Sequence, residues 1–275
     1  MRYFKRLTFW KPNGPIYLFI GGDFEMFSGL IERYCLFPCQ LANETNGALF
    51  ASEHRYYGES MPVDIKDTSS MKYLSSKQAL ADLAALIKTI KSAPEFKSSK
   101  VVVIGGSYAG NLAAWMRLLY PDLVDAAVSS SAPLLAKKDF NEYLEARCNE
   151  FGNFETTNSD KQPFGHNVPL DFFIKQCQAI FGEDFNEKRV DDGVAQTNIM
   201  YGGITPNVTN VVFTHGDMDP WRRLGVLKDL SDTAVVRITN GTSNSALLNL
   251  DSSNPALLKD REYVKQMIKK WIEKA

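Results

Sequence analysis

Histidine and cysteine are scarce in this sequence, and neither sign of charge is in excess. The 275 residues include 3 histidines and 4 cysteines, and the formal net charge is −1. A protein with so little positive charge cannot neutralise many phosphates, so we expect no nucleic-acid partner. The histidines and cysteines lack the spacing of a closed zinc site and no cofactor motif occurs, so we expect neither a metal nor an organic cofactor.

Long apolar runs are also missing. The apolar stretches, such as 16–20 and 101–104, have the length of strands and are far shorter than the roughly 20 residues that a membrane span needs. We therefore expect a soluble protein with no membrane partner. Segment 1–10 carries charges and has no continuous apolar stretch, so it does not resemble a signal peptide.

Some features favour the secretory pathway. The chain has three N-glycosylation sequons, at Asn43, Asn207 and Asn240. Together with an even number of cysteines they fit an oxidising route, so we expect a lysosomal or extracellular protein whose signal peptide is absent from this chain. Four cysteines allow three pairings, and one of these joins Cys148 to Cys177 and Cys35 to Cys39.

Apolar, β-rich segments alternate with helical patterns along most of the chain, which is typical of an α/β protein with a mainly parallel sheet. We expect strands at 16–21, 48–53, 101–105, 126–130, 210–214 and 234–238. Ser76 is expected to cap a helix whose apolar residues recur on one face. The last helix repeats this pattern, with a stripe at Val264, Met267, Ile268 and Trp271.

The alternation lapses between 137 and 184, in a stretch that contains Cys, Asn and Gln and has no clear strand. We therefore expect an α/β core formed by 1–136 and 185–275, with a cap-like insertion at 137–184. Neither an internal repeat nor a low-complexity tract is present.

The sharpest local motif is Val-Val-Val-Ile-Gly-Gly-Ser-Tyr-Ala-Gly at 101–110, which predicts a buried strand that turns into a helix at Ser107. Such a turn exposes the serine hydroxyl, and it needs small residues on either side because strand and helix pack closely there. Gly105 and Ala109 meet this requirement. The alternatives are a plain glycine-rich turn or a nucleotide loop, although no Lys-Ser/Thr pair follows the glycines as a P-loop would require.

In hydrolases with this turn, the acid and the base follow the serine on loops after later strands. Asp219 follows the strand expected at 210–214 and is the candidate acid, although Asp-Pro is also a common turn sequence. The strand expected at 234–238 leads into the loop where a histidine base would lie, and that loop contains none. The three histidines are at other positions: His54, His166 and His215.

Five segments, at 14–22, 53–58, 73–82, 105–110 and 219–221, together resemble the prolyl carboxypeptidase family of serine peptidases, which includes dipeptidyl peptidase 7 and thymus-specific serine protease. The most specific of them is Glu-His-Arg-Tyr-Tyr-Gly at 53–58. The resemblance implies an α/β-hydrolase fold, with Ser107 as nucleophile and Asp219 as acid. It also implies an oxyanion hole formed by the N–H of Tyr108 and a donor near Gly22, or by tyrosines of 53–58.

The chain departs from this family in two ways. Relatives carry a long helical insertion over the active site, whereas here the segment 145–148 almost abuts the core, so most of the cap is expected to be missing. Relatives also have Ser-His where this chain has Ser243-Asn244. An amide cannot accept a proton from serine, and loss of a triad member costs on the order of 10⁴ to 10⁶ in rate.

The resemblance implies a serine-type exopeptidase that hydrolyses peptides, near proline, through an acyl-serine. The alternative is an inactive pseudo-peptidase that binds peptides or a protein partner in the retained cleft, and a third reading is an incomplete gene product. A homodimer is left open. We expect His215 to brace the acid turn and His54 to order its own loop.

Overall fold

The computed structural model describes residues 1–32, 35, 37–139, 152–154, 156–158, 166–248 and 254–273. The chain divides into two compact units. The larger consists of Met1–Ala132, Asn207–Arg222 and Val226–Ala275, and the smaller of Pro133–Pro206 with Arg223–Gly225. Each unit has a sheet and helices of its own.

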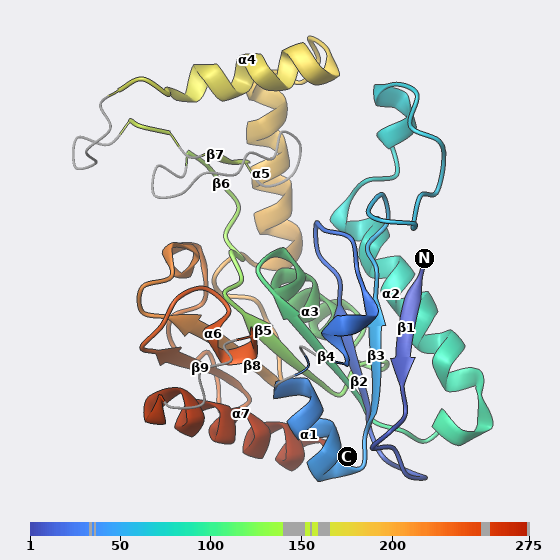
Figure 1. Ribbon diagram of the computed structural model, residues 1–275. Helices are drawn as coiled ribbons and strands as arrows, with labels where there is room; N and C mark the ends of the chain where they lie inside the picture. The colour runs from blue at the N-terminus through green and yellow to red at the C-terminus, as the bar shows by residue number, and fades with distance from the viewer. Residues whose placement is uncertain are drawn as a thin grey trace. The chain divides into compact units, whose positions relative to one another are not determined.

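The larger unit is built on a seven-stranded sheet in the order β1-β3-β2-β4-β5-β8-β9 (Figure 1). The strands are β1 (Tyr3–Arg6), β2 (Ile16–Ile20), β3 (Ala48–Ser52), β4 (Val101–Gly106), β5 (Ala126–Ser130), β8 (Val211–Gly216) and β9 (Ala234–Thr239). Only β1 is antiparallel to its neighbour. The carboxyl ends of the other six strands therefore meet at one edge of the sheet, where ligands of open α/β sheets bind.

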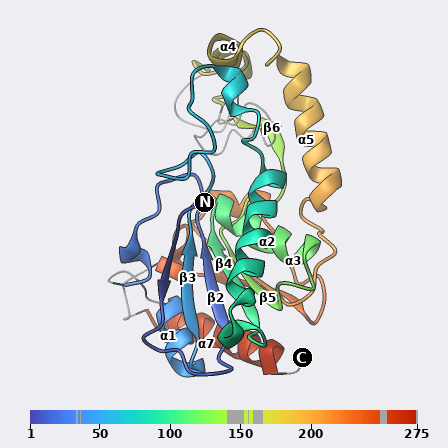
Figure 2. The same cartoon turned by 90° about the vertical axis from the view of Figure 1, so that its right-hand side faces the viewer.

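Helices cover both faces of this sheet (Figures 1 and 2). They are α1 (Phe37–Thr45), α2 (Ser76–Ser92), α3 (Tyr108–Leu119), α6 (Ser245–Leu248) and α7 (Pro255–Glu273), with 3-10 turns η1 (Ser28–Leu30), η2 (Thr68–Met71), η3 (Pro94–Phe96) and η4 (Pro220–Leu224). Buried residues of α1 and α7 pack against β2 to β5 in one core cluster, while α2 and α3 lie on the opposite face. Because both faces are covered, β2, β3 and β5 are buried at every position.

All six expected strands are present, with ends displaced by two residues at most. The expected stripe of the last helix is also confirmed, since Val264, Ile268 and Trp271 are buried in the core. The predicted cap of α2 was wrong by one residue, because Ser75 is the N-cap and its hydroxyl accepts a hydrogen bond from the N–H of Gln78 at 3.3 Å. Strand β1 was not expected, since four alternately exposed residues at a sheet edge give little signal.

The smaller unit contains the parallel pair β6 (Lys137–Asp139) and β7 (Gly152–Phe154), together with α4 (Leu170–Phe181) and α5 (Glu187–Tyr201). Its core cluster consists of Phe154, Phe173, Ile174, Cys177 and Val190. The sequence boundary at 184 falls before α5, whereas the compact unit runs on to Pro206 because α5 packs against β6 and β7.

One of the expected cysteine pairs is present, since Cys35 and Cys39 form a disulfide. Cys177 is also disulfide-bonded, and its expected partner Cys148 lies outside the described residues. Among the described helices, none combines the length and the apolar character that crossing a bilayer requires. In the described ranges no group of three or more potential metal ligands comes together.

Candidate active site

Ser107 lies at the corner between β4 and α3, with φ 55° and ψ −129°. A positive φ is costly for a residue with a side chain, and it is typical of a nucleophile held on a sharp strand-to-helix turn. The turn is tight because a Cβ at Gly105 would lie 2.0 Å from the carbonyl oxygen of Ala109. The small residue expected at Gly105 is therefore required, and Ser107 is half-buried at the carboxyl edge of the sheet.

Asp219 lies on the turn that follows β8, and only 1% of it is exposed. The N–H of Trp221 donates to Oδ1 at 3.1 Å, whereas Oδ2 has no hydrogen-bond partner among the described residues. Burial raises the pKa of the Asp219 carboxyl, and the nearby hydroxyls of Ser131 and Ser243 oppose this rise. A carboxylate placed in this way can orient and stabilise a neighbouring cation.

Asn244 lies on the loop between β9 and α6, with φ 57°. Its side chain packs directly over Gly106, since a Cβ there would lie 2.4 Å from the Asn244 Oδ1. Its Nδ2 donates to Ser243 Oγ at 3.3 Å, and Oδ1 is buried with no partner among the described residues. Residue 244 therefore contacts the residue that precedes Ser107, but its amide has no atom that can accept a proton at neutral pH.

Ser131 joins these elements and was not identified from the sequence. It follows β5, is fully buried and has φ 50°. Its hydroxyl accepts a hydrogen bond from the backbone N–H of Asn244 at 2.7 Å. In the sheet β5 lies between β4 and β8, so Ser131 stands between the serine corner and the acid turn.

Two residues of α7 hold the ends of the loop that carries Asn244. The carboxylate of Asp260 accepts a hydrogen bond from the Thr239 hydroxyl at 2.6 Å, at the end of β9. The guanidinium of Arg261, which is 5% exposed, donates to the carbonyl of Ser245 at 3.2 Å. Neither residue carries a sequence motif, because both look like ordinary polar positions of an amphipathic helix.

The candidate oxyanion residues lie at the same corner. Tyr108 is the first residue of α3, and Gly22 follows β2, where a Cβ would lie 3.7 Å from the backbone nitrogen of Ala109. The Tyr108 hydroxyl is 3.1 Å from His54 Nε2, and His54 Nδ1 is 2.7 Å from the carbonyl of Arg55. A carbonyl only accepts, so Nδ1 carries the hydrogen and Nε2 accepts from Tyr108. Burial lowers the pKa of His54 and keeps this neutral form.

The segment 53–58 is organised around a buried carboxylate. Glu53 accepts hydrogen bonds from the Arg2 guanidinium, from Ser60 Oγ at 2.7 Å and from the N–H groups of Met26 and Glu59 at 3.1 Å each. Gly58 has φ 55°, and a Cβ on it would lie 2.0 Å from Glu53 Oε1. The family-specific sequence therefore has a structural role, which is to fix the loop after β3.

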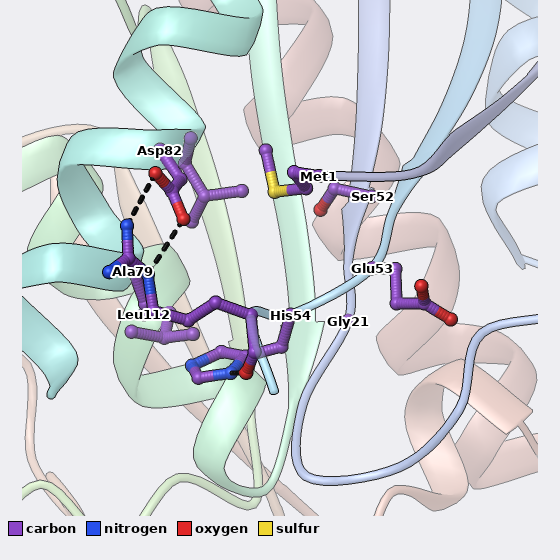
Figure 3. A pocket seen from close by; sticks show the side chains of 10 residues that line it. Met1, Gly21, Ser52, Glu53, His54, Ala79, Asp82 and Leu112 are labelled. Atoms are coloured by element: carbon purple, nitrogen blue, oxygen red, sulfur yellow. Dashed lines mark hydrogen bonds and ion pairs between the residues drawn. The ribbon is translucent and has the colours of Figure 1, made fainter. Parts of the chain in front are cut away.

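His54, Asp82 and Leu112 line a small hollow at the end of β3 (Figure 3). Asp82 receives two hydrogen bonds from the Arg55 guanidinium, at 2.8 and 2.7 Å, which tie α2 to the loop after β3. The lining includes neither Ser107 nor Asp219. We therefore regard the hollow as a packing feature behind the site.

None of the three histidines lies on the loop that carries Asn244. His215 is buried on β8, and burial lowers its pKa to about 4. Neither of its ring nitrogens makes a hydrogen bond within the described part of the chain, so His215 does not brace the acid turn through its ring as expected. His166 is exposed in the smaller unit. His54 does order its loop.

The three sequon asparagines are all exposed on described surface: Asn43, Asn207 and Asn240. Asn43 is on α1, and the other two lie in loops of the larger unit. Exposure is what attachment of a glycan requires.

Comparison with known proteins identifies relatives along the chain. The family profile described as Serine carboxypeptidase S28 matches residues 1–147 and 146–264. Lysosomal Pro-X carboxypeptidase of Homo sapiens is 39% identical over 167 residues, 58% of this chain and 32% of that protein. Thymus-specific serine protease of Mus musculus is 24% identical over 414 residues, 94% of this chain and 81% of that protein. That alignment exceeds the 275 residues of the chain, so this relative has stretches with no counterpart here.

Solved structures resemble the chain in fold. Acylaminoacyl peptidase of Pyrococcus horikoshii has a TM-score of 0.58 at 12% identity, covering 96% of this chain and 38% of the other. An esterase of Pyrococcus furiosus has a TM-score of 0.52 at 12% identity, covering 95% and 84%. These likenesses confirm the expected α/β-hydrolase fold.

Proposed function

Because the chain belongs to the serine carboxypeptidase S28 family of serine peptidases, we propose that it is a serine-type exopeptidase that hydrolyses peptides near proline through an acyl-serine on Ser107. One observation carries the proposal: a serine with φ 55° ends a central strand, and residue 244 packs against its neighbour Gly106. A strained serine in this position has no evident structural purpose, and it suits a nucleophile.

In the proposed reaction, Ser107 Oγ attacks the scissile carbonyl carbon, its proton passes to solvent water because residue 244 supplies no base, and the leaving amine takes a proton from water. The carbonyl oxygen gains negative charge, which the N–H of Tyr108 and a donor near Gly22 stabilise. Water then hydrolyses the acyl-serine and releases the second product. Asp219 holds the acid position of this triad.

Asn244 limits the reaction because it occupies the position of the base. Its amide orients groups by hydrogen bonds but takes no proton from Ser107. Without a base, catalysis falls to what binding and the oxyanion hole supply, on the order of 10³ to 10⁴ over the rate in water. We therefore propose a very slow peptidase in which the serine corner and the acid turn are retained.

A second candidate function follows from the same residue. The Asn244 Nδ2 is already bonded to Ser243, and its Oδ1 is buried without a described partner. A site that recognises an acyl group and never cleaves it is a binding site, so the alternative is a pseudo-peptidase that holds peptides or a protein partner.

The substrate preference and the cellular location rest on the relatives. A relative named Pro-X carboxypeptidase supports cleavage next to proline, and its name also places that protein in lysosomes. Three exposed sequons and a disulfide support a secretory route for this chain. The family profile matches in two parts that meet at 146–147, which supports a shortened cap after the proposed core segment 1–136.

Restoring the base tests the proposal. Asn244→His places an imidazole on a backbone whose φ of 57° histidine tolerates. We expect labelling of Ser107 by a fluorophosphonate probe, and hydrolysis of a proline-containing peptide, to rise by about 10³-fold or more over the unmodified chain. Asn244→His with Ser107→Ala is the matched control and should lose both signals.

The outcomes separate the two candidate functions. If Asn244→His reacts neither with the probe nor with peptide, the peptidase proposal is wrong. Binding of a proline-containing peptide by the unmodified chain, measured by calorimetry and weakened in Ser107→Trp, would then favour the pseudo-peptidase.

A further inference from the structure

The turn after β8 and the loop after β9 are in direct contact beyond the end of the sheet. We call residues 216–222 the acid turn, because they contain Asp219, and residues 239–245 the base loop, because they contain Asn244. The two segments meet at Gly216, where a Cβ would lie 2.3 and 2.4 Å from two carbonyl oxygens of the base loop. Glycine is therefore required at the end of β8, because only glycine lets the base loop approach so closely.

Three of the described hydrogen bonds cross between the acid turn and the base loop. Two are made by backbone groups: the N–H of Asp217 donates to the carbonyl of Thr239 at 2.8 Å, and the N–H of Met218 donates to the carbonyl of Gly241 at 3.0 Å. The third uses a side chain, because Asp217 Oδ1 accepts from the N–H of Gly241 at 2.9 Å. Asp217 therefore binds the base loop through both its backbone and its carboxylate.

The bond from Gly241 to the Asp217 carboxylate differs in kind from the two backbone bonds. Those bonds use carbonyls of the base loop, and a carbonyl oxygen accepts over a broad range of directions. The third bond uses an N–H of the base loop, and an N–H donates close to one line. Gly241 has no side chain to limit its backbone angles, so its conformation depends on bonds to both of its peptide groups. The Asp217 carboxylate supplies one of them.

We propose that Asp217 is a positioning residue of this site, whose carboxylate holds the base loop in register with the acid turn. Asp217 lies two residues before Asp219, and its partner Gly241 lies three residues before Asn244. A shift at this contact is therefore transmitted over a short stretch of backbone to the acid and to residue 244. This inference rests on the proposed function, because it assigns Asp217 to the same site.

Loss of the Asp217 carboxylate should shift the base loop without releasing it. Two bonds to α7 hold the ends of the loop, and Ser131 Oγ accepts from the N–H of Asn244 at 2.7 Å. These bonds reach α7 and the end of β5, and none of them reaches the acid turn. The two backbone bonds from the acid turn also remain. Asp217→Ala is therefore expected to change the geometry of the site while the chain stays folded.

The first test needs no activity and uses amide NMR of the unmodified chain. We expect Asp217→Ala to speed hydrogen exchange at the Gly241 amide about 10-fold or more, because the N–H loses its acceptor, and to shift the amide signal of Asn244. Asp217→Asn keeps an accepting oxygen and should restore most of both values. Asp232→Ala removes an exposed carboxylate ahead of β9 and is the matched control. If the Asn244 signal is the same in Asp217→Ala as in the unmodified chain, the inference is wrong.

The second test uses Asn244→His as the active background. Adding Asp217→Ala should lower kcat about 5-fold or more with little change in KM, because a displaced base slows the chemical step. Asp217→Asn should recover most of the loss, and Asp232→Ala should cause none. A lower melting temperature with an unchanged kcat would show a purely structural role and contradict the inference.

The two proposals can fail separately. If Asn244→His is inactive while Asp217→Ala still moves the amide signals of Gly241 and Asn244, the proposed function fails and the control of the base loop by Asp217 stands. If Asn244→His is active and Asp217→Ala changes neither the signals nor kcat, the proposed function stands and the role of Asp217 fails.

Discussion

Three residues of the candidate site adopt positive φ: Ser107 at 55°, Ser131 at 50° and Asn244 at 57°. Each such conformation costs on the order of 1–3 kcal/mol, and it persists only where the surroundings enforce it. Here the surroundings are the tight contact at Gly105, the packing of Asn244 on Gly106 and the hydrogen bond between Ser131 and Asn244. The serine corner and the amide of residue 244 thus share a strained backbone conformation.

The buried carboxyl of Asp219 should reduce the stability of the protein. Burial raises its pKa, so between the usual aspartate pKa of about 3.9 and the raised value the folded chain binds more protons than the unfolded chain, and stability falls as pH rises. We expect Asp219→Asn to stabilise the protein at pH 7 by about 1 kcal/mol. The gain should shrink as pH falls below the aspartate pKa, and urea unfolding at several pH values measures it. A constant gain at every pH would contradict this account.

The pKa of Glu53 is shifted in the opposite direction to that of Asp219, so Glu53 should stabilise the protein. Burial alone would raise its pKa, but hydrogen bonds from Arg2, Ser60 and the N–H of Met26 outweigh burial and lower it. Its stabilising effect is therefore present above about pH 4.3 and is lost as pH falls through the lowered value. We expect Glu53→Gln to destabilise the protein by about 2 kcal/mol at pH 7, measured by urea unfolding.

Glu25→Gln is the matched control for Glu53→Gln. Glu25 also pairs with Arg2, but 67% of its side chain is exposed, so its removal should cost under about 0.5 kcal/mol. If both substitutions reduce stability by the same amount, burial of Glu53 is not the cause of its stabilising effect.

At the scale of elements, local signals were enough for six of the seven strands of the larger sheet and for the serine corner. Buried strands such as β4 are continuous apolar runs, and glycines mark the turn into α3. The hydrogen bond between Ser131 and Asn244 could not be predicted, because these residues are 113 positions apart and a lone serine after a strand has no distinguishing spacing. Asp260 and Arg261 were missed for the same reason, since only the packing of α7 shows what they bind.

The connection between α2 and the loop after β3 depends on the planar guanidinium group of Arg55. Both guanidinium nitrogens Nε and Nη2 bind Asp82, and Nη1 binds Gln78 and the carbonyl of Tyr73. Lysine keeps the charge but cannot make the paired bonds. We expect Arg55→Lys to destabilise the protein by about 1–2 kcal/mol in thermal unfolding.

Lys88→Arg provides the comparison for Arg55→Lys, because Lys88 lies on the exposed face of α2, the helix that carries Asp82. A neutral result is expected there, within about 0.5 kcal/mol. If Arg55→Lys is equally neutral, the paired hydrogen bonds between Arg55 and Asp82 do not stabilise the loop after β3.

For the molecule as a whole, the family and the fold followed from five short segments, while the extent of the smaller unit did not. Helix α5 belongs to that unit because it contacts β6 and β7. In the sequence, however, it falls in the segment 185–275 that was assigned to the core. The family profile matches the chain in two parts, 1–147 and 146–264, which meet within the range of the smaller unit.

Expression in a secretory host should give a glycosylated protein. We expect glycans at Asn43, Asn207 and Asn240, because all three are exposed, and peptide mapping after enzymatic deglycosylation identifies them. Asn→Gln at each site is the appropriate control. Substitution of Thr45 is unsuitable, since its hydroxyl bonds Tyr17 at 2.8 Å and Leu41 at 2.7 Å. Absence of glycan at all three sites would argue against a secretory route.

The backbone at residue 244 has an evolutionary consequence. Its φ of 57° lies in the region that asparagine and histidine both tolerate better than most residues. The codons of these two amino acids differ only in their first nucleotide. A single point mutation therefore introduces the proposed histidine base at residue 244 without a change of backbone conformation.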